Sequence, residues 1–123
     1  MKYHDYHLKS YSVCDFGKTI TLHLVYPDST KDESEIRFSD VVVHDFIHTG
    51  GAIITDIFET ELSKISKELE NGLVEWAGKF GGLAYYDGDL ELCKAKLEKN
   101  GCKIWTICSA IGFEGIIIAK SKK

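Results

Sequence analysis

The chain has 123 residues, 44% of them hydrophobic and 28% charged, and its formal net charge is −4. This composition is typical of one globular domain that buries its own core, and it excludes a disordered chain. No apolar run approaches the roughly 18 residues of a membrane helix, and the N-terminus lacks the apolar stretch of a signal peptide. We therefore expect a single domain over residues 1–123, located in the cytoplasm and not bound to a membrane.

Acidic side chains are concentrated in the first half of the chain. Residues 1–61 carry 5 basic and 11 acidic side chains, whereas residues 62–123 carry 10 basic and 8 acidic ones. A negative surface repels phosphate backbones, which argues against direct nucleic-acid binding and favours a basic protein or a metal ion as partner. The alternative is a solvated face that only keeps the chain soluble. The carboxylates that we expect to contact a partner are Asp28, Asp32, Glu33, Glu35, Asp56, Glu59 and Glu61.

Alternating residues predict strands in the first half. Ile20, Leu22 and Leu24 fall on one face of the segment 19–26, which is the period of two of a half-buried strand. The segment 6–14 precedes it and predicts a hairpin with a turn at 16–18. Two further strands are expected at 36–48 and 52–58. The first needs a bulge near Ser39 and Asp40, where its apolar residues change parity, and a glycine turn at 49–51 separates the two.

The apolar spacing changes to three and four residues after residue 60. This spacing predicts a helix over about 60–79, with Thr60 as N-cap and Gly81 and Gly82 at its end. A second helix begins at Asp87 or Asp89 and ends at 100–101, and two strands follow at about 103–110 and 115–120, joined by a loop at 111–114. The apolar stripe of the first helix comprises Leu62, Ile65, Leu69, Leu73, Trp76 and Phe80.

The order of these elements is β-β-β-β-α-α-β-β. Strands that cluster before and after the helices indicate an α+β fold, not alternating α/β units. We expect a largely antiparallel twisted sheet with both helices on one face, which leaves the other face to solvent or to a partner.

The sequence contains no recognisable catalytic or cofactor motif. The segment 44–48 resembles half of a metalloprotease signature, in which His44 and His48 would lie one helical turn apart. The valines at 41–43 favour a strand, where these histidines would be about 13 Å apart, too far to share an ion. We therefore expect no metal and no cofactor. The four cysteines are Cys14, Cys93, Cys102 and Cys108. No pair of them has Cys-x-x-Cys spacing, and in a reducing cytosol we expect most of them to be small core residues.

Several segments resemble a group of small bacterial proteins. They are Tyr11-Ser12-Val13, Lys18-Thr19-Ile20 with Leu22, Ile36-x-Phe38-x-Asp40-Val41, His44-x-Phe46, the strand from Gly51 to Ile57, and the C-terminal stretch from Ile107 to Lys120. Some members of this group look like immunity proteins of contact-dependent growth inhibition and related polymorphic toxin systems. The resemblance implies tight binding to one cognate toxin, often a nuclease, and it carries no catalytic residues.

Three hypotheses follow from these observations. The first is an immunity-type inhibitor, monomeric when free, whose acidic surface is steered onto the positive cleft of a nuclease toxin. The second is a small enzyme that uses histidine and carboxylate chemistry, with His23, His44 and Asp45 as first candidates. The third is a non-catalytic adaptor that associates with itself through an exposed edge strand.

Overall fold

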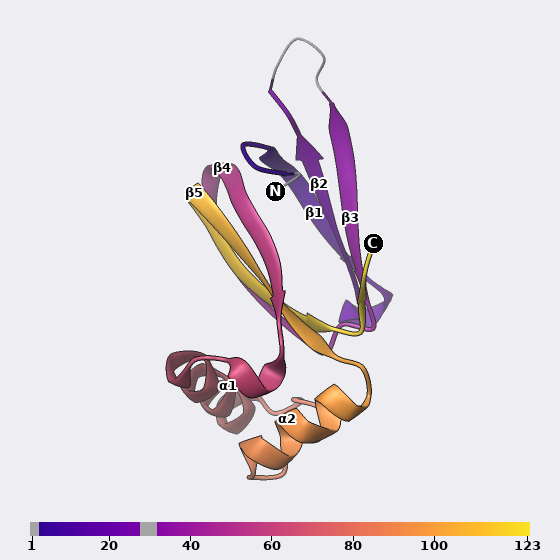
Figure 1. Ribbon diagram of the computed structural model, residues 1–123, viewed down its shortest axis with the longest axis vertical. Coiled ribbons are helices and arrows are strands. Elements are labelled where there is room, and N and C mark those ends of the chain that lie inside the picture. Colours follow the sequence, from indigo (N-terminus) through magenta and orange to yellow (C-terminus); the bar gives the residue numbers. More distant parts are fainter. Residues whose placement is uncertain (1–2, 28–31) are drawn as a thin grey trace.

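The computed structural model describes residues 3–27 and 32–123, apart from the side chain of Phe80 (Figure 1). Its strands are β1 (His7–Cys14), β2 (Thr19–Val25), β3 (Glu33–Ser39), β4 (Val43–Thr60), β5 (Lys103–Ala119) and β6 (Ser121–Lys122). Its helices are α1 (Lys67–Phe80) and α2 (Leu90–Lys99). The predicted α+β class, with two helices between the fourth and fifth strands, is confirmed.

The six strands form one antiparallel sheet in the order β5-β4-β1-β2-β3-β6. β6 follows β5 after Lys120 alone, yet it pairs with β3 at the opposite end of the order. The sheet must therefore curl until its two ends approach each other. Figure 1 shows the resulting half-barrel, in which β1–β3 face β4 and β5, and the helices lie beyond one end.

β4 and β5 form one long ribbon that bends sharply in the middle. Pairing continues on both sides of the bend, from His48 with Phe113 to Ile53 with Ile111. The expected turn at 49–51 and loop at 111–114 are therefore bends within continuous strands. Gly112 has a φ of +86°, and a Cβ there would lie 3.0 Å from the backbone N and Cα of Ala52. Glycine permits both this conformation and this close approach.

The strand expected at 36–48 is two strands in the structure. β3 ends at Ser39, and Asp40 has a φ of +54°, a left-handed conformation that a continuing strand does not accommodate. The change of apolar parity at this position marks the crossing from β3 to β4, not a bulge within one strand. The backbone N–H of Val42 donates to the carbonyl of Ile118 (2.7 Å), which fixes the start of the ribbon.

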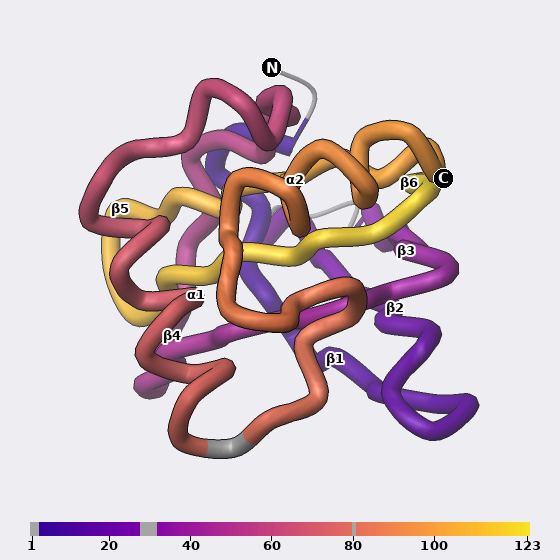
Figure 2. Tube along the Cα trace, turned by 90° about the horizontal axis from the view of Figure 1, so that it is seen from below, coloured from indigo at the N-terminus to yellow at the C-terminus, as the bar shows by residue number. Residues whose placement is uncertain are grey.

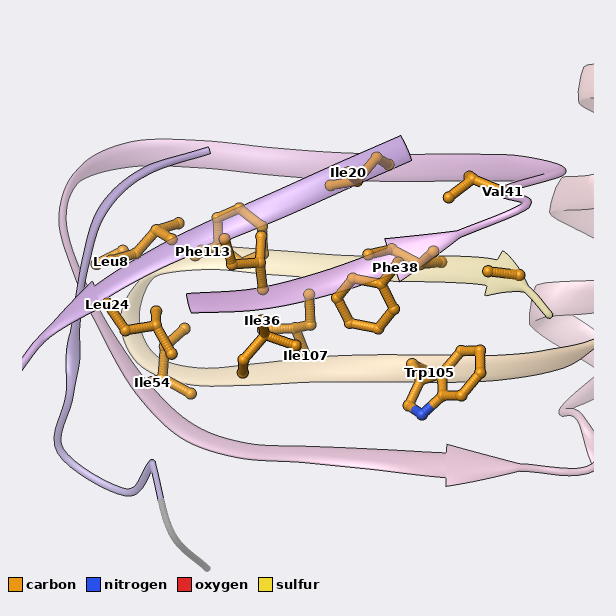
Figure 3. Close-up of a cluster of buried hydrophobic side chains, with 14 residues drawn as sticks. Leu8, Ile20, Leu24, Ile36, Phe38, Val41, Ile54, Trp105, Ile107 and Phe113 are labelled. Carbon is orange, nitrogen blue, oxygen red and sulfur yellow. The ribbon is translucent and has the colours of Figure 1, made fainter. Parts of the chain in front are cut away.

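Two hydrophobic clusters lie on opposite sides of the ribbon. The first fills the inside of the curl, where Ile20, Leu22 and Leu24 are fully buried, as their alternation predicts. Figure 3 shows side chains of this cluster between the arms of the ribbon. The second lies between the ribbon and the helices. Ile117 belongs to the first cluster and Ile118 to the second, so β5 is covered on both faces at this end.

The first helix begins later than its apolar stripe predicts. β4 continues through Thr60, which pairs with Ile104 of β5, so Thr60 is not the N-cap. Ser66 caps α1 instead, and its hydroxyl accepts a hydrogen bond from the backbone N–H of Leu69 (3.1 Å). Of the two predicted caps of α2, Asp87 and Asp89, the structure shows Asp89. Figure 2 shows both helices across the end of the ribbon, and neither helix in the described part of the chain is long and apolar enough to span a membrane.

Candidate functional site: an acidic groove beside the first helix

The predicted partner-binding carboxylates at the start of β3 already have partners. Asp32 accepts a hydrogen bond from the hydroxyl of Tyr6. Glu33 forms an ion pair with Lys9 of β1, and Glu35 lies 3.2 Å from Nδ1 of His23 on β2. These contacts follow from the antiparallel register, in which Glu35 is directly opposite His23. Asp28 lies outside the described residues.

The other predicted carboxylates lie in β4 or, in the case of Glu61, directly after it. Glu59 pairs with Lys103 of β5 (3.4 Å), and Glu61 pairs with Lys64 (3.5 Å). Asp56 is half-buried, and no ion pair of its side chain is present among the described residues. In Figure 1, β3 begins at the upper end of the molecule, whereas β4 ends beside α1 at the lower end. The structure therefore does not bring the two groups of carboxylates onto one surface, and their contact with a partner stays a prediction.

The histidines of β4 belong to a group of packed rings inside the curl. We call this group the aromatic wall: Tyr11, His44, Phe46, His48 and Phe113. The histidine rings pack against phenylalanines, His44 against Phe46 (5.1 Å between centroids) and His48 against Phe113 (5.5 Å). Burial lowers the pKa of His44, although the neighbouring charge of Asp45 opposes this effect. Within the described residues, no group of three or more His, Cys, Asp or Glu side chains could hold a metal ion. As neighbours in a strand, His44 and Asp45 also point to opposite faces of the sheet and cannot act on one substrate together.

A groove with a volume of about 470 Å³ lies between the start of α1 and the outer face of the β4–β5 ribbon. In the register of the ribbon, Asp45 is opposite Ile116, and Ile47 is opposite Glu114. Residues directly opposite each other project from the same face of an antiparallel pair. The four side chains therefore form a square in which two carboxylates and two isoleucines occupy alternate corners. Ile47 is 65% exposed, so this apolar surface is open to a partner.

The helix contributes a third carboxylate to this groove. Glu68 stands in the first turn of α1, where the helix dipole favours a negative charge. Within the part of the chain that the structure describes, none of the three carboxylates takes part in an ion pair. We call the surface formed by Asp45, Ile47, Glu68, Glu114 and Ile116, with Leu69 at its edge, the acidic groove.

A charge cluster between the helices holds the helical wall of the acidic groove in place. Lys94 of α2 is almost completely buried, and its Nζ lies 3.0 Å from carboxylate oxygens of both Glu70 and Glu91. Burial disfavours the charge of Lys94, but the hydrogen bonds to these carboxylates outweigh this effect and raise its pKa. The hydrogen bond from Lys94 also lowers the pKa of Glu70 on α1. α1 is therefore linked to α2 by a pair that stays charged, which fixes the position of Glu68, two residues from Glu70 on the same helix.

The sequence contained little signal for the acidic groove. Its three carboxylates stand 23 and 46 positions apart along the chain, and only the fold makes them neighbours. The sequence marked Asp45 only as part of a metalloprotease-like segment and as a candidate residue of a small enzyme, not as a partner contact. No family model, no curated protein and no solved structure matches this chain. The resemblance to immunity proteins therefore stays a prediction that rests on the segments quoted above.

Proposed function

We propose that this chain is a binding protein whose acidic groove receives a cationic, partly apolar segment of a partner protein. The observation that carries the proposal is the combination, in one groove, of the exposed Ile47 with three carboxylates that form no ion pair with any residue the structure describes. An exposed ion pair contributes little by itself, about 0.5 kcal/mol. Several such pairs around a buried apolar contact supply both affinity and a defined register.

The particular form that we propose is an immunity-type inhibitor of a basic nuclease toxin. A nuclease needs a positive cleft for its phosphate substrate, and a carboxylate-lined surface is complementary to such a cleft. This form rests on the sequence resemblance as well as on the charge of the groove. The predicted contacts at Asp32, Glu33 and Glu35 are less favoured, because their intramolecular partners would have to be displaced.

The experiment is to measure association with the protein encoded beside this gene, at about 50 mM and about 300 mM salt, where screening differs strongly. The groove variant carries Asp45→Asn, Glu68→Gln and Glu114→Gln. Three contacts of about 0.5 kcal/mol each predict a loss of affinity of roughly tenfold at low salt, mostly in the association rate. The difference between wild type and variant should shrink at high salt.

The matched control removes the same number of charges elsewhere. It carries Asp32→Asn, Glu33→Gln and Glu35→Gln, and we expect its association rate to change less than about twofold, since long-range steering is its only effect. A greater loss in the control than in the groove variant would place the contact on β3 instead. Absence of binding at low salt would rule out the neighbouring protein as the cognate partner, and equal binding by all three proteins would refute the electrostatic mechanism.

A further inference from the structure

The outer face of β1–β3 carries the single arginine of the chain. All 14 other basic residues are lysines, and Arg37 lies on β3 directly opposite Thr21 of β2, which is opposite Ser12 of β1. One row across three strands therefore presents a guanidinium and two hydroxyls on the same face. Neither helix covers this face, because both helices lie below the β4–β5 ribbon, at the lower end of the molecule in Figure 1. A hollow of about 470 Å³ lies over the row.

Thr21 is the unusual member of the row. Its side chain is only 8% exposed, and its hydroxyl has no hydrogen-bond partner among the residues that the structure describes. No fully buried side-chain polar atom in this part of the chain lacks a partner, so the hydroxyl must open into the hollow that Thr21 lines. A polar group that is nearly buried gains most from a hydrogen bond, because solvent serves it poorly.

Arg37 is also the only lysine or arginine that lines this hollow within the described residues. Two carboxylates line it as well: Asp15 accepts a hydrogen bond from the hydroxyl of Thr19 (2.9 Å), and Glu35 lies against Nδ1 of His23 (3.2 Å). The guanidinium takes part in no ion pair within that part of the chain. Its planar, forked donors match an oxyanion, which a lysine ammonium does not do.

We propose that this hollow binds the oxyanion group of a small molecule, a carboxylate or a phosphate. In this site Arg37 supplies the charge, and the hydroxyls of Thr21 and Ser12 donate hydrogen bonds to the oxygens that the guanidinium leaves free. The hollow has the volume of a small-ligand site but is open to solvent, so the affinity for a minimal anion is low, with a Kd on the order of 1 mM. The site lies on another face than the acidic groove and does not depend on the function proposed for the groove.

The test is a titration of the isotopically labelled chain, with backbone amide shifts as readout and chloride exchanged to keep the ionic strength constant. The two probes are inorganic phosphate and succinate, each added to about 20 mM, well above the expected Kd. We expect saturable shifts centred on Thr21 and Arg37, and the tighter probe identifies the preferred oxyanion. Shifts that stay linear, or are absent, with both probes would overturn the proposal.

Three variants separate a site from a general attraction of anions. Arg37→Gln should abolish saturation. Arg37→Lys should weaken binding at least about threefold because the forked donors of the guanidinium are lost. Thr21→Val should weaken binding about fivefold, because it removes the hydroxyl and keeps the shape of the side chain. Lys18→Gln removes one exposed cation on the same hairpin, outside the lining of the hollow, and should leave the Kd unchanged. An equal loss in Lys18→Gln and Arg37→Gln would show nonspecific attraction and refute the site.

Discussion

Substituting Gly115 by alanine tests the packing of the aromatic wall. Gly115 lies opposite Phe46 in the ribbon, and a Cβ at this position would lie 2.6 Å from Cδ1 of Phe46 and 2.9 Å from Cε1 of Phe113. Carbon atoms in contact are normally about 3.5–4.0 Å apart, so the ring of Phe46 would have to retreat by roughly 1 Å. That ring also packs against Tyr11 and His44, each at 5.1 Å between centroids, which limits where it can go.

The sign of this effect distinguishes packing from chain entropy. The φ of Gly115 lies outside the left-handed region, and in such a position Gly→Ala normally stabilises a protein by about 0.4–1 kcal/mol. Overpacking costs about 1–3 kcal/mol, so we expect a net destabilisation of about 1–2 kcal/mol for Gly115→Ala. Gly78→Ala is the matched control: a Cβ there meets no atom within 4 Å in helix α1, and it should stabilise the protein by up to about 1 kcal/mol.

Urea unfolding followed by tryptophan fluorescence measures both changes. Trp105 is buried against Phe38, with ring centroids 5.6 Å apart, so its emission reports on the inside of the curl. The midpoint should shift without a change in the m-value. Phe46→Leu in the Gly115→Ala background should recover part of the loss, with a coupling of about 1 kcal/mol. If Gly115→Ala is as stable as wild type, or more stable, the ring of Phe46 does not lie over Gly115.

Three further predictions concern pH, capping and thiol reactivity. Burial lowers the pKa of His44 from 6.5, so the unfolded chain binds a proton at this side chain more readily than the folded chain does. The free energy of unfolding should therefore fall as the pH drops below about 6.5, and urea unfolding of His44→Phe should show a shallower fall. In the same assay, Asp89→Ala removes the cap of α2 and should cost about 1 kcal/mol, whereas an equal cost for Asp87→Ala would refute that assignment. Cys14 is exposed, while burial raises the pKa of the Cys93 thiol, so mass spectrometry should find a thiol reagent on Cys14 first.

The sequence predicted those elements whose ends are set by local chemistry. The alternation of Ile20, Leu22 and Leu24 was sufficient to orient β2 because only that face of the strand packs into the hydrophobic core. The end of the first helix at Gly81 and the cap at Asp89 depend on backbone groups within a few residues of the signal. Such features do not require knowledge of distant contacts.

Boundaries set by pairing with a distant strand were predicted wrongly. Thr60 has the chemistry of an N-cap, but Ile104, 44 residues later, pairs with it and keeps it in β4. Glycines at 50, 51 and 112 are typical of turns between strands, yet here they let two paired strands bend together. Local propensity gave the less stable alternative in both cases, because the ladder of β4 and β5 supplies hydrogen bonds that an early helix or a loop would forfeit.

The same reasoning explains why the density of acidic residues along the sequence did not locate an acidic surface. An antiparallel sheet places residues that are far apart along the chain side by side, so the carboxylates of β3 meet Lys9 and His23, and Glu59 meets Lys103. Acidic residues that form such pairs add little negative electrostatic potential to the surface on which they lie. The acidic groove instead gathers one carboxylate from each of three elements. Asp45 and Glu114 have isoleucines opposite them in the register, and Glu68, although it follows Lys67, forms no ion pair among the described residues. The electrostatic function that we propose therefore depends on which charges remain unpaired once the strands have met, a property of the register and not of the composition.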